Sequence, residues 1–222
     1  MGRRSLAVLA CTGLALVAGL AYFAFARPLA VTPRLGPAPA FRLVDARERP
    51  ITHQALAGYT VIYSFFTTAA SDRAGQVMAG QLRALQDHMA QDPARFERVR
   101  LAAITLDPER DTPGRIAEFA REAGADPSRW VFLTGPPLAV KLTAGSGFGV
   151  YYDVVPGGPP VYESRYVLVD GQGVIRGIYP GPNLDVPRLL RDLDRVERES
   201  RATGAARVVY EAAHLFLCYP GL

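Results

Sequence analysis

Cysteine is nearly absent from this sequence, because Cys11 and Cys218 are the only two among 222 residues. Cys11 lies within a long apolar stretch near the N-terminus, so the rest of the chain contains a single thiol. A disulfide framework needs paired cysteines, and thiol–disulfide exchange needs one thiolate to attack and a second sulfur to resolve the mixed disulfide. The sequence therefore excludes both an intramolecular disulfide framework and dithiol chemistry in the folded part of the chain.

Lysine is also scarce, since Lys141 is the only one and the other cationic side chains are arginines. The formal net charge is +4, and Arg3 and Arg4 supply two of the positive charges at the N-terminus. Proteins that bind nucleic acids concentrate basic residues in a patch or stripe, and the sequence contains no such stripe. We therefore expect no nucleic-acid partner.

Charge is missing altogether from residues 5–26. A helix of that length reaches about 33 Å, which is enough to cross a hydrocarbon core of about 30 Å. Arg3 and Arg4 precede the segment, so the positive-inside rule predicts a cytoplasmic N-terminus and an exported remainder. We expect a membrane anchor over residues 1–27 with a single N-terminal span in a bacterial inner membrane, and a soluble domain on the periplasmic side.

Two other interpretations of this segment stay open. Ala24-Phe25-Ala26 has the A-x-A pattern of a cleavage site, although signal-peptide apolar cores usually run about 7–15 residues. Val8-Leu9-Ala10-Cys11 resembles a lipobox, but few apolar residues precede it. An anchor, a cleaved signal and a lipidated cysteine would all export the domain.

Prolines concentrate in residues 28–39, which predicts a semi-rigid, extended linker. Beyond it, segments with strand-like and helix-like patterns alternate. We expect strands over residues 41–45, 59–66, 99–106, 131–134, 166–169 and 174–179, and helices over 75–90, 114–123, 138–149 and 184–201. This order predicts an α/β three-layer sandwich with a mixed sheet over residues 40–198.

Several motifs, in this order, resemble the SCO/SenC family of thioredoxin-fold proteins. Leu106-Asp-Pro-Glu-Arg-Asp-Thr-Pro113 is similar to the family's D-P-x-R-D-T-P, and Trp130-Val-Phe-Leu-Thr-Gly135 to its W-x-x-L-T-G. Gly149-Val-Tyr and Leu168-Val-Asp-Gly-Gln-Gly-Val-Ile-Arg add further matches, and the similarity spans roughly residues 38–197. Several ordered motifs are far more specific than one, and the resemblance implies a thioredoxin-like fold.

The resemblance also implies a membrane-tethered protein that assists assembly of the binuclear copper centre of haem-copper oxidases. Family members bind copper through a C-x-x-x-C pair and a distant histidine. On this chain the cysteine positions align with Ala70 and Ala74, and the histidine position with Tyr162. Cu(I) needs soft thiolate or thioether donors, which an alanine methyl cannot supply. We therefore expect no copper, no other cofactor and no enzymatic activity at this site.

A copper metallochaperone with substitute methionine and histidine ligands is the alternative. His88 and Met89 lie near the end of the expected helix over residues 75–90, which also contains Met78. Methionines at helical spacing are more often core residues. His214 and Cys218 are spaced i, i+4 and could share one helical face, but two ligands do not complete a metal site.

The C-terminal extension, residues 199–222, continues past the expected end of the domain and contains an apolar stretch too short to span a bilayer. It either folds back on its own domain or contacts a partner or membrane surface, because exposed apolar patches usually mark contact sites. The expected partner-binding residues are Val208, Val209, Leu215, Phe216 and Leu217.

Together these patterns favour a non-catalytic accessory or structural subunit of a membrane protein complex, or an assembly factor for one. A respiratory oxidase is the partner complex that the family resemblance suggests. The chain would then be a family member whose copper and thiol chemistry has been replaced, with its folded domain kept as a binding module.

Overall fold

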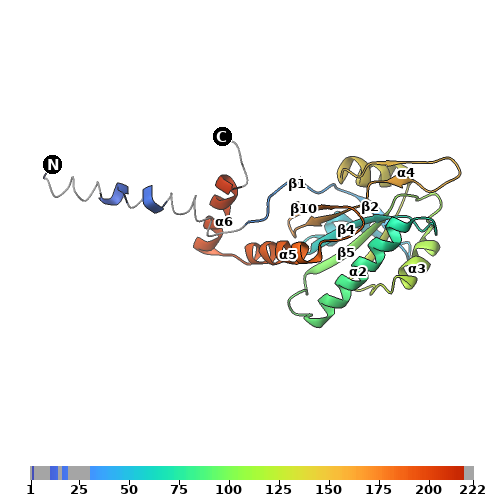
Figure 1. Ribbon diagram of the computed structural model, residues 1–222, viewed down its shortest axis with the longest axis horizontal. Helices are drawn as coiled ribbons and strands as arrows, with labels where there is room; N and C mark the ends of the chain where they lie inside the picture. The colour runs from blue at the N-terminus through green and yellow to red at the C-terminus, as the bar shows by residue number, and fades with distance from the viewer. Residues whose placement is uncertain (1, 3–10, 15–16, 20–30, 218–222) are drawn as a thin grey trace.

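The computed structural model describes residues 2, 11–14, 17–19 and 31–217, with side chains as far as His214 (Figure 1). The expected anchor over residues 5–26 lies mostly outside this part of the chain, and Cys218 lies wholly outside it. Within the described residues, no helix combines the length and the apolar character that crossing a membrane requires.

A mixed eight-stranded sheet forms the centre of the molecule (Figure 1). The pairs β4–β5 and β5–β6 are parallel, and the other neighbouring strands run antiparallel. The first strand of the sheet lies inside the segment that we expected to be a linker. In order across the sheet the strands are β1 (Gly36–Pro37), β10 (Val174–Pro180), β9 (Arg165–Val169), β4 (Thr60–Phe66), β5 (Val99–Thr105), β6 (Trp130–Thr134), β2 (Arg42–Asp45) and β3 (Pro50–Thr52).

Strand β4 lies inside the sheet, between β9 and β5, and every one of its seven residues is buried. Successive side chains of a strand point to opposite faces of the sheet. Ile62 and Phe66 therefore enter the core on one face, whereas Val61, Tyr63 and Phe65 enter the core on the other. A strand covered on both faces reads as a continuous apolar run, which is why the sequence pattern identified it.

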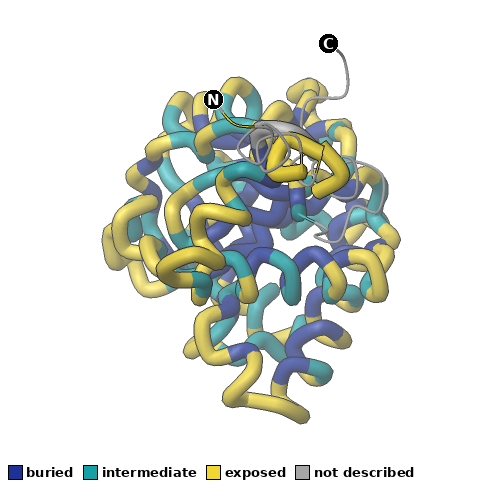
Figure 2. The backbone as a smooth tube through the Cα atoms, turned by 90° about the vertical axis from the view of Figure 1, so that its left-hand side faces the viewer, coloured by how far each residue is buried: buried dark blue, intermediate teal, exposed yellow. Residues whose placement is uncertain are grey.

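Helices cover both faces of this sheet and complete the expected α/β architecture. One core packs the sheet against the helices α2 (Arg73–Gln91), α3 (Pro113–Glu122) and α5 (Val186–Ser200). The opposite core includes α4 (Pro137–Val140) and the π-helical segment Lys141–Gly147 that continues it. Figure 2 shows the buried backbone gathered inside the molecule beneath exposed turns.

Three smaller elements complete the described chain. A 3₁₀ helix, His53–Leu56, connects β3 to β4. The strands β7 (Tyr152–Asp153) and β8 (Val161–Tyr162) form a separate antiparallel pair in which Tyr152 faces Tyr162. The last helix, α6 (Gly204–Leu217), follows α5 and lies next to the chain that enters the domain at the N-terminal end (Figure 1).

A buried arginine joins these two ends of the described chain. The Arg176 side chain is only 2% exposed and pairs with Asp170 at 2.9 Å and Glu199 at 2.5 Å. It also donates hydrogen bonds to the backbone carbonyls of Thr32 and Pro33, at 2.7 and 3.2 Å. One guanidinium therefore connects the incoming chain, the β9–β10 turn and the end of α5.

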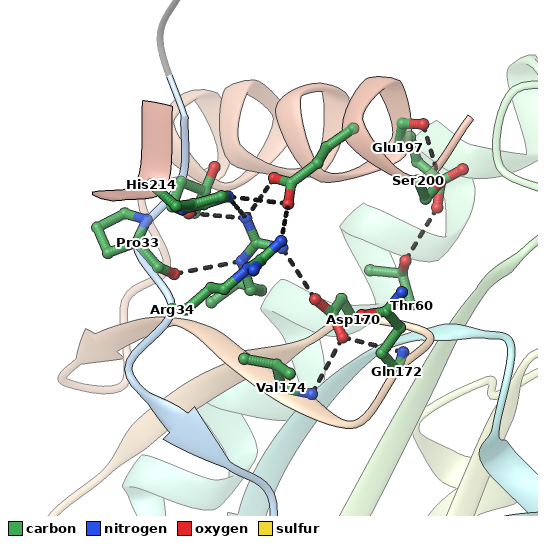
Figure 3. Close-up of polar contacts among 12 residues, drawn as sticks. Pro33, Arg34, Thr60, Asp170, Gln172, Val174, Glu197, Ser200 and His214 are labelled. Carbon is green, nitrogen blue, oxygen red and sulfur yellow. Dashed lines mark hydrogen bonds and ion pairs between the residues drawn. The ribbon is translucent and has the colours of Figure 1, made fainter. Parts of the chain in front are cut away.

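The same cluster fastens α6 through polar residues. His214 Nε2 lies 2.9 Å from a Glu199 carboxylate oxygen, and Figure 3 shows His214 and Arg34 in this polar cluster. Arg34 pairs with both Glu199 and Glu211 at 2.9 Å. Burial alone would raise the pKa of Glu199, but the hydrogen bond and charge of Arg176 lower it. The extension thus folds back on its own domain at His214.

Replacing Arg176 with methionine should destabilise the protein strongly. Removing one partner of a buried ion pair leaves uncompensated charge, which typically costs about 3–5 kcal/mol. Arg95→Met is the matched control, because Arg95 pairs with Asp194 at 2.7 Å on the surface, where such pairs contribute at most about 1 kcal/mol. Urea unfolding of the two variants in mild detergent measures the difference. Equal losses would mean that the buried cluster does not hold the fold together.

Candidate functional site

The two positions that we expected to align with the cysteines of the SCO/SenC family, Ala70 and Ala74, lie on the turn between β4 and α2 and at the start of α2. Ala70 is exposed in this turn and Ala74 is half-buried in the first turn of α2. Asp72, between them, is the N-cap of α2 and accepts a hydrogen bond from the Gly75 amide at 2.8 Å. Aspartate is a preferred N-cap because its carboxylate satisfies a free amide of the first turn.

Asp72 also fixes the loop that leads into the helix. Its carboxylate accepts hydrogen bonds from the Thr67 amide at 2.9 Å and from the Thr67 hydroxyl at 3.1 Å. A Cβ atom added to Gly75 would lie 2.4 Å from an Asp72 carboxylate oxygen, so the glycine is needed for this close approach. The loop is therefore closed around a buried carboxylate.

Tyr162, which we expected at the family's histidine position, reaches this loop from β8. Its hydroxyl donates to Asp72, with oxygen–oxygen distances of 2.9 and 3.1 Å. Burial, and after it the negative charge of Asp72, raises the pKa of Tyr162. The phenol is therefore neutral and acts as a hydrogen-bond donor. The structure thus brings Tyr162 to the loop between Ala70 and Ala74.

The residues at these three positions do not suit a copper ion. Two of them end in a methyl group and the third is a phenol whose oxygen is engaged with Asp72. Copper sites in proteins use thiolate, thioether or imidazole donors. Among the residues that the structure describes, no group of three or more histidine, cysteine, aspartate and glutamate side chains is placed to hold a metal ion.

A second buried carboxylate, Asp111, holds the loop from the other side. It accepts hydrogen bonds from the Thr68 amide at 3.1 Å and from the hydroxyls of Thr68 and Thr105. Burial raises the pKa of Asp111 above its ordinary value, although these hydrogen bonds oppose the shift. The second aspartate of the D-P-x-R-D-T-P motif, Asp111, therefore stabilises the loop that carries Ala70 through hydrogen bonds.

Arg110 connects the same motif to the β7–β8 pair. Its guanidinium lies 2.6 Å from Asp107 and donates a hydrogen bond to the carbonyl of Gly158. Beside this contact, Tyr151, Val154 and Val161 are 64%, 70% and 67% exposed. The loop therefore lies next to an apolar edge that the sequence patterns did not identify, because alternating exposure in such short strands gives no clear period.

The possible substitute ligands do not gather in one place. Met78 and Met89 are both buried in the core beneath α2. His88 is ten residues after Met78, which is about 15 Å along a helix at 1.5 Å per residue. His88 instead packs its ring against Phe96, with 5.8 Å between ring centroids. His214 belongs to the Glu199 cluster described above, and its expected partner Cys218 lies outside the described residues.

Of the residues expected to bind a partner, two can be placed. Val208 and Val209 lie on α6 and are 67% and 42% exposed. The side chains of the other three, Leu215, Phe216 and Leu217, lie outside the described residues.

Comparisons with known proteins agree on one family and one fold. A family model described as SCO1/SenC matches residues 32–198. None of the curated proteins compared with the chain matches it.

Three solved structures illustrate the likeness of fold. A SCO1/SenC family lipoprotein from Bacillus anthracis is 20% identical, with a TM-score of 0.69 over 76% of this chain and 99% of its own. Arabidopsis thaliana ScoI with copper bound is 22% identical, with a TM-score of 0.63 over 72% of this chain and 98% of its own. BsSco, described as a member of the Sco family of cytochrome c oxidase assembly proteins, is 20% identical, with a TM-score of 0.66 over 76% of this chain and 98% of its own. The expected thioredoxin-like fold is thereby confirmed.

Removing the Tyr162 hydroxyl should destabilise the loop measurably. Tyr162→Phe takes one donor from a buried carboxylate, and hydrogen bonds to charged groups contribute about 1.5 kcal/mol or more. Tyr151→Phe is the matched control, because Tyr151 also donates to a carboxylate, Asp153 at 3.0 Å, but is exposed. Its stability should stay unchanged. Urea midpoints that fall equally in both variants would contradict a specific contribution of the Tyr162–Asp72 contact.

Proposed function

The chain belongs to the SCO1/SenC family, and from that premise we propose that it is a copper-free member that serves a membrane complex as an accessory or structural subunit, or as its assembly factor. The family is associated with cytochrome c oxidase assembly and copper binding. The observation that carries the proposal is the hydrogen bond from Tyr162 to Asp72 at 2.9 Å. It puts a neutral, protonated group where a copper-binding relative needs an imidazole.

The chemistry of the loop supports a loss of copper and thiol activity. Metal ligation and thiol exchange both need a lone pair on a soft or basic atom. Ala70 and Ala74 supply none, and the Tyr162 oxygen belongs to a neutral phenol, a hard and weakly basic donor that keeps its proton on the side of Asp72. The loop nevertheless keeps its shape, because Asp72 and Asp111 satisfy its polar groups from opposite sides. We infer that what is retained is a binding surface.

Binding of a partner protein is the simplest explanation for a retained surface at this loop. The β7–β8 pair beside the loop leaves Tyr151, Val154 and Val161 more than 60% exposed, and exposed apolar side chains of this size can form part of an interaction site. We propose a periplasmic, membrane-anchored location in a bacterial inner membrane, with an extramembrane part of a respiratory-type complex as partner. The relative BsSco, whose description names cytochrome c oxidase assembly, makes an oxidase the first complex to test.

The protein should bind neither Cu(I) nor Cu(II) tightly, because the three aligned positions lack copper donors. Titration of the purified full chain against a competing chelator measures this. Restoring the ligands with Ala70→Cys, Ala74→Cys and Tyr162→His together should create measurable binding on the same scaffold. The double variant Ala70→Cys, Ala74→Cys is the matched control for the histidine.

Sub-micromolar binding of one equivalent of copper by the unaltered chain would contradict the copper-free proposal and favour the metallochaperone alternative. A folded triple variant that still binds no copper would show that the alignment of these three positions is wrong.

Placing a charge on the apolar edge should weaken association with the complex. We expect Val154→Asp to lower the amount of a respiratory-type complex that co-purifies with the full chain in mild detergent, without lowering its thermal stability. Ala84→Asp is the control, because it puts the same charge on an exposed position of α2. Equal recovery of the complex with both variants would show that this edge is not the contact surface.

A further inference from the structure

Helix α6 turns its polar side toward its own domain. Glu211 pairs with Arg34 at 2.9 Å, and His214 lies 2.9 Å from Glu199. His214 is 7% exposed and Ala213 is fully buried. A cavity of about 230 Å³ beside this face is lined largely by polar residues from α5, α6 and the β9–β10 turn. The contact between α6 and the domain is therefore ionic rather than apolar.

The opposite side of α6 is apolar and faces outward. All residues from 203 to 209 are exposed, and Val208 is 67% exposed. At 100° per residue, Ala205, Val208, Val209 and Ala212 fall on the side away from His214.

This arrangement is the reverse of that in a helix on a water-soluble domain, which turns its apolar stripe to the core and its charges to solvent. An apolar stripe that faces outward is stabilised where something apolar covers it, and Arg207 and Glu211 of the same helix are exposed as well. The position of α6 beside the incoming chain at Thr32 and Arg34 indicates which apolar surface could cover the stripe.

The incoming chain is fastened directly to α6. The Thr32 carbonyl accepts a hydrogen bond from Arg176 at 2.7 Å, and Arg34 bridges Glu199 and Glu211. Arg34 is only eight positions after Ala26, the last residue of the uncharged segment. Fully extended, they span at most about 28 Å. A bilayer crossed by residues 5–26 therefore lies within reach of α6.

The same end of the molecule carries exposed arginines. A hollow there is lined by Arg98, Arg100 and Arg201 with one acidic side chain, Glu97. Arg98 also lines the cavity beside α6, together with Arg207, and neither forms an ion pair within the described part of the chain. Arginines at this end of the molecule suit the interface of a bilayer that contains anionic lipids, and Glu197, Glu199 and Glu211 line the same cavity as Arg98 and Arg207.

We propose that the outward face of α6, formed by Ala205, Val208, Val209 and Ala212, lies in the lipid headgroup region of the membrane that holds the N-terminal segment. The proposal rests on the membrane anchor in the proposed function, but not on the absence of copper. The helix would act as a second membrane contact that fixes the orientation of the domain relative to the bilayer.

A nitroxide label at Val208 tests this in vesicles of phosphatidylethanolamine and phosphatidylglycerol. The full chain carries Cys11→Ser, Cys218→Ser and Val208→Cys, and collision rates are measured with oxygen and with a water-soluble nickel chelate. The matched control is Val154→Cys in the same background, because Val154 is 70% exposed at the other end of the molecule. We expect a several-fold lower nickel collision rate and a higher oxygen collision rate at position 208 than at 154.

A label at position 208 that is as accessible to nickel as the label at 154 would overturn the proposal and leave the stripe to a partner protein that the vesicles lack. Spin–spin broadening between labels would overturn it in favour of a second copy. Protein that does not stay with the vesicles would refute the anchor together with this proposal. None of these outcomes bears on copper binding, which the chelator titration decides separately.

Discussion

The burial of one arginine constrains the end of the molecule where the chain enters and leaves the domain. A guanidinium stays charged at every relevant pH, and removing it from water is costly unless anions and carbonyls replace the solvent. Arg176 is 2% exposed, so it requires Asp170 and Glu199 as well as the carbonyls of Thr32 and Pro33. Satisfying that single charge fixes the incoming chain and the end of α5, and Glu199 in turn receives His214 of α6.

At the opposite end of β4, two buried carboxylates hold the chain in place. Their hydrogen-bond donors are all neutral groups. Asp72 is satisfied by Thr67, Gly75 and Tyr162, and Asp111 by Thr68 in the loop and Thr105 at the end of β5. A loop held in this way needs neither a disulfide nor a metal to keep its conformation. The conformation of the turn therefore does not depend on a thiol, and the family fold is present around a loop that contains no cysteine.

The sequence predicts well what depends on local periodicity or on an ordered set of motifs. The buried run of β4 and the stripe of α2 are visible in their apolar residues, and the D-P-x-R-D-T-P and W-x-x-L-T-G matches identify the family. It does not predict contacts between distant polar residues. Tyr162 and Asp72 are 90 positions apart, and Arg34 and Glu211 are 177 apart. Nothing in the local sequence pattern around any of these residues indicates which residue it contacts. From the sequence, Tyr162 is therefore interpreted only as the residue at the expected histidine position.

The α6 end and the Asp72 loop end of the molecule are separated by the length of strand β4. This separation limits which part of a partner can contact the loop. Thr60, at the start of β4, lines the cavity beside α6, and Phe66, at its end, leads into the loop with Asp72. Seven residues of strand extend about 20 Å at 3.3 Å per residue. With α6 in the headgroup region, the loop and its apolar edge at Val154 are displaced from α6 by that distance. A partner that contacts the edge with a part outside the membrane then fits this geometry better than one that contacts it within the hydrocarbon core.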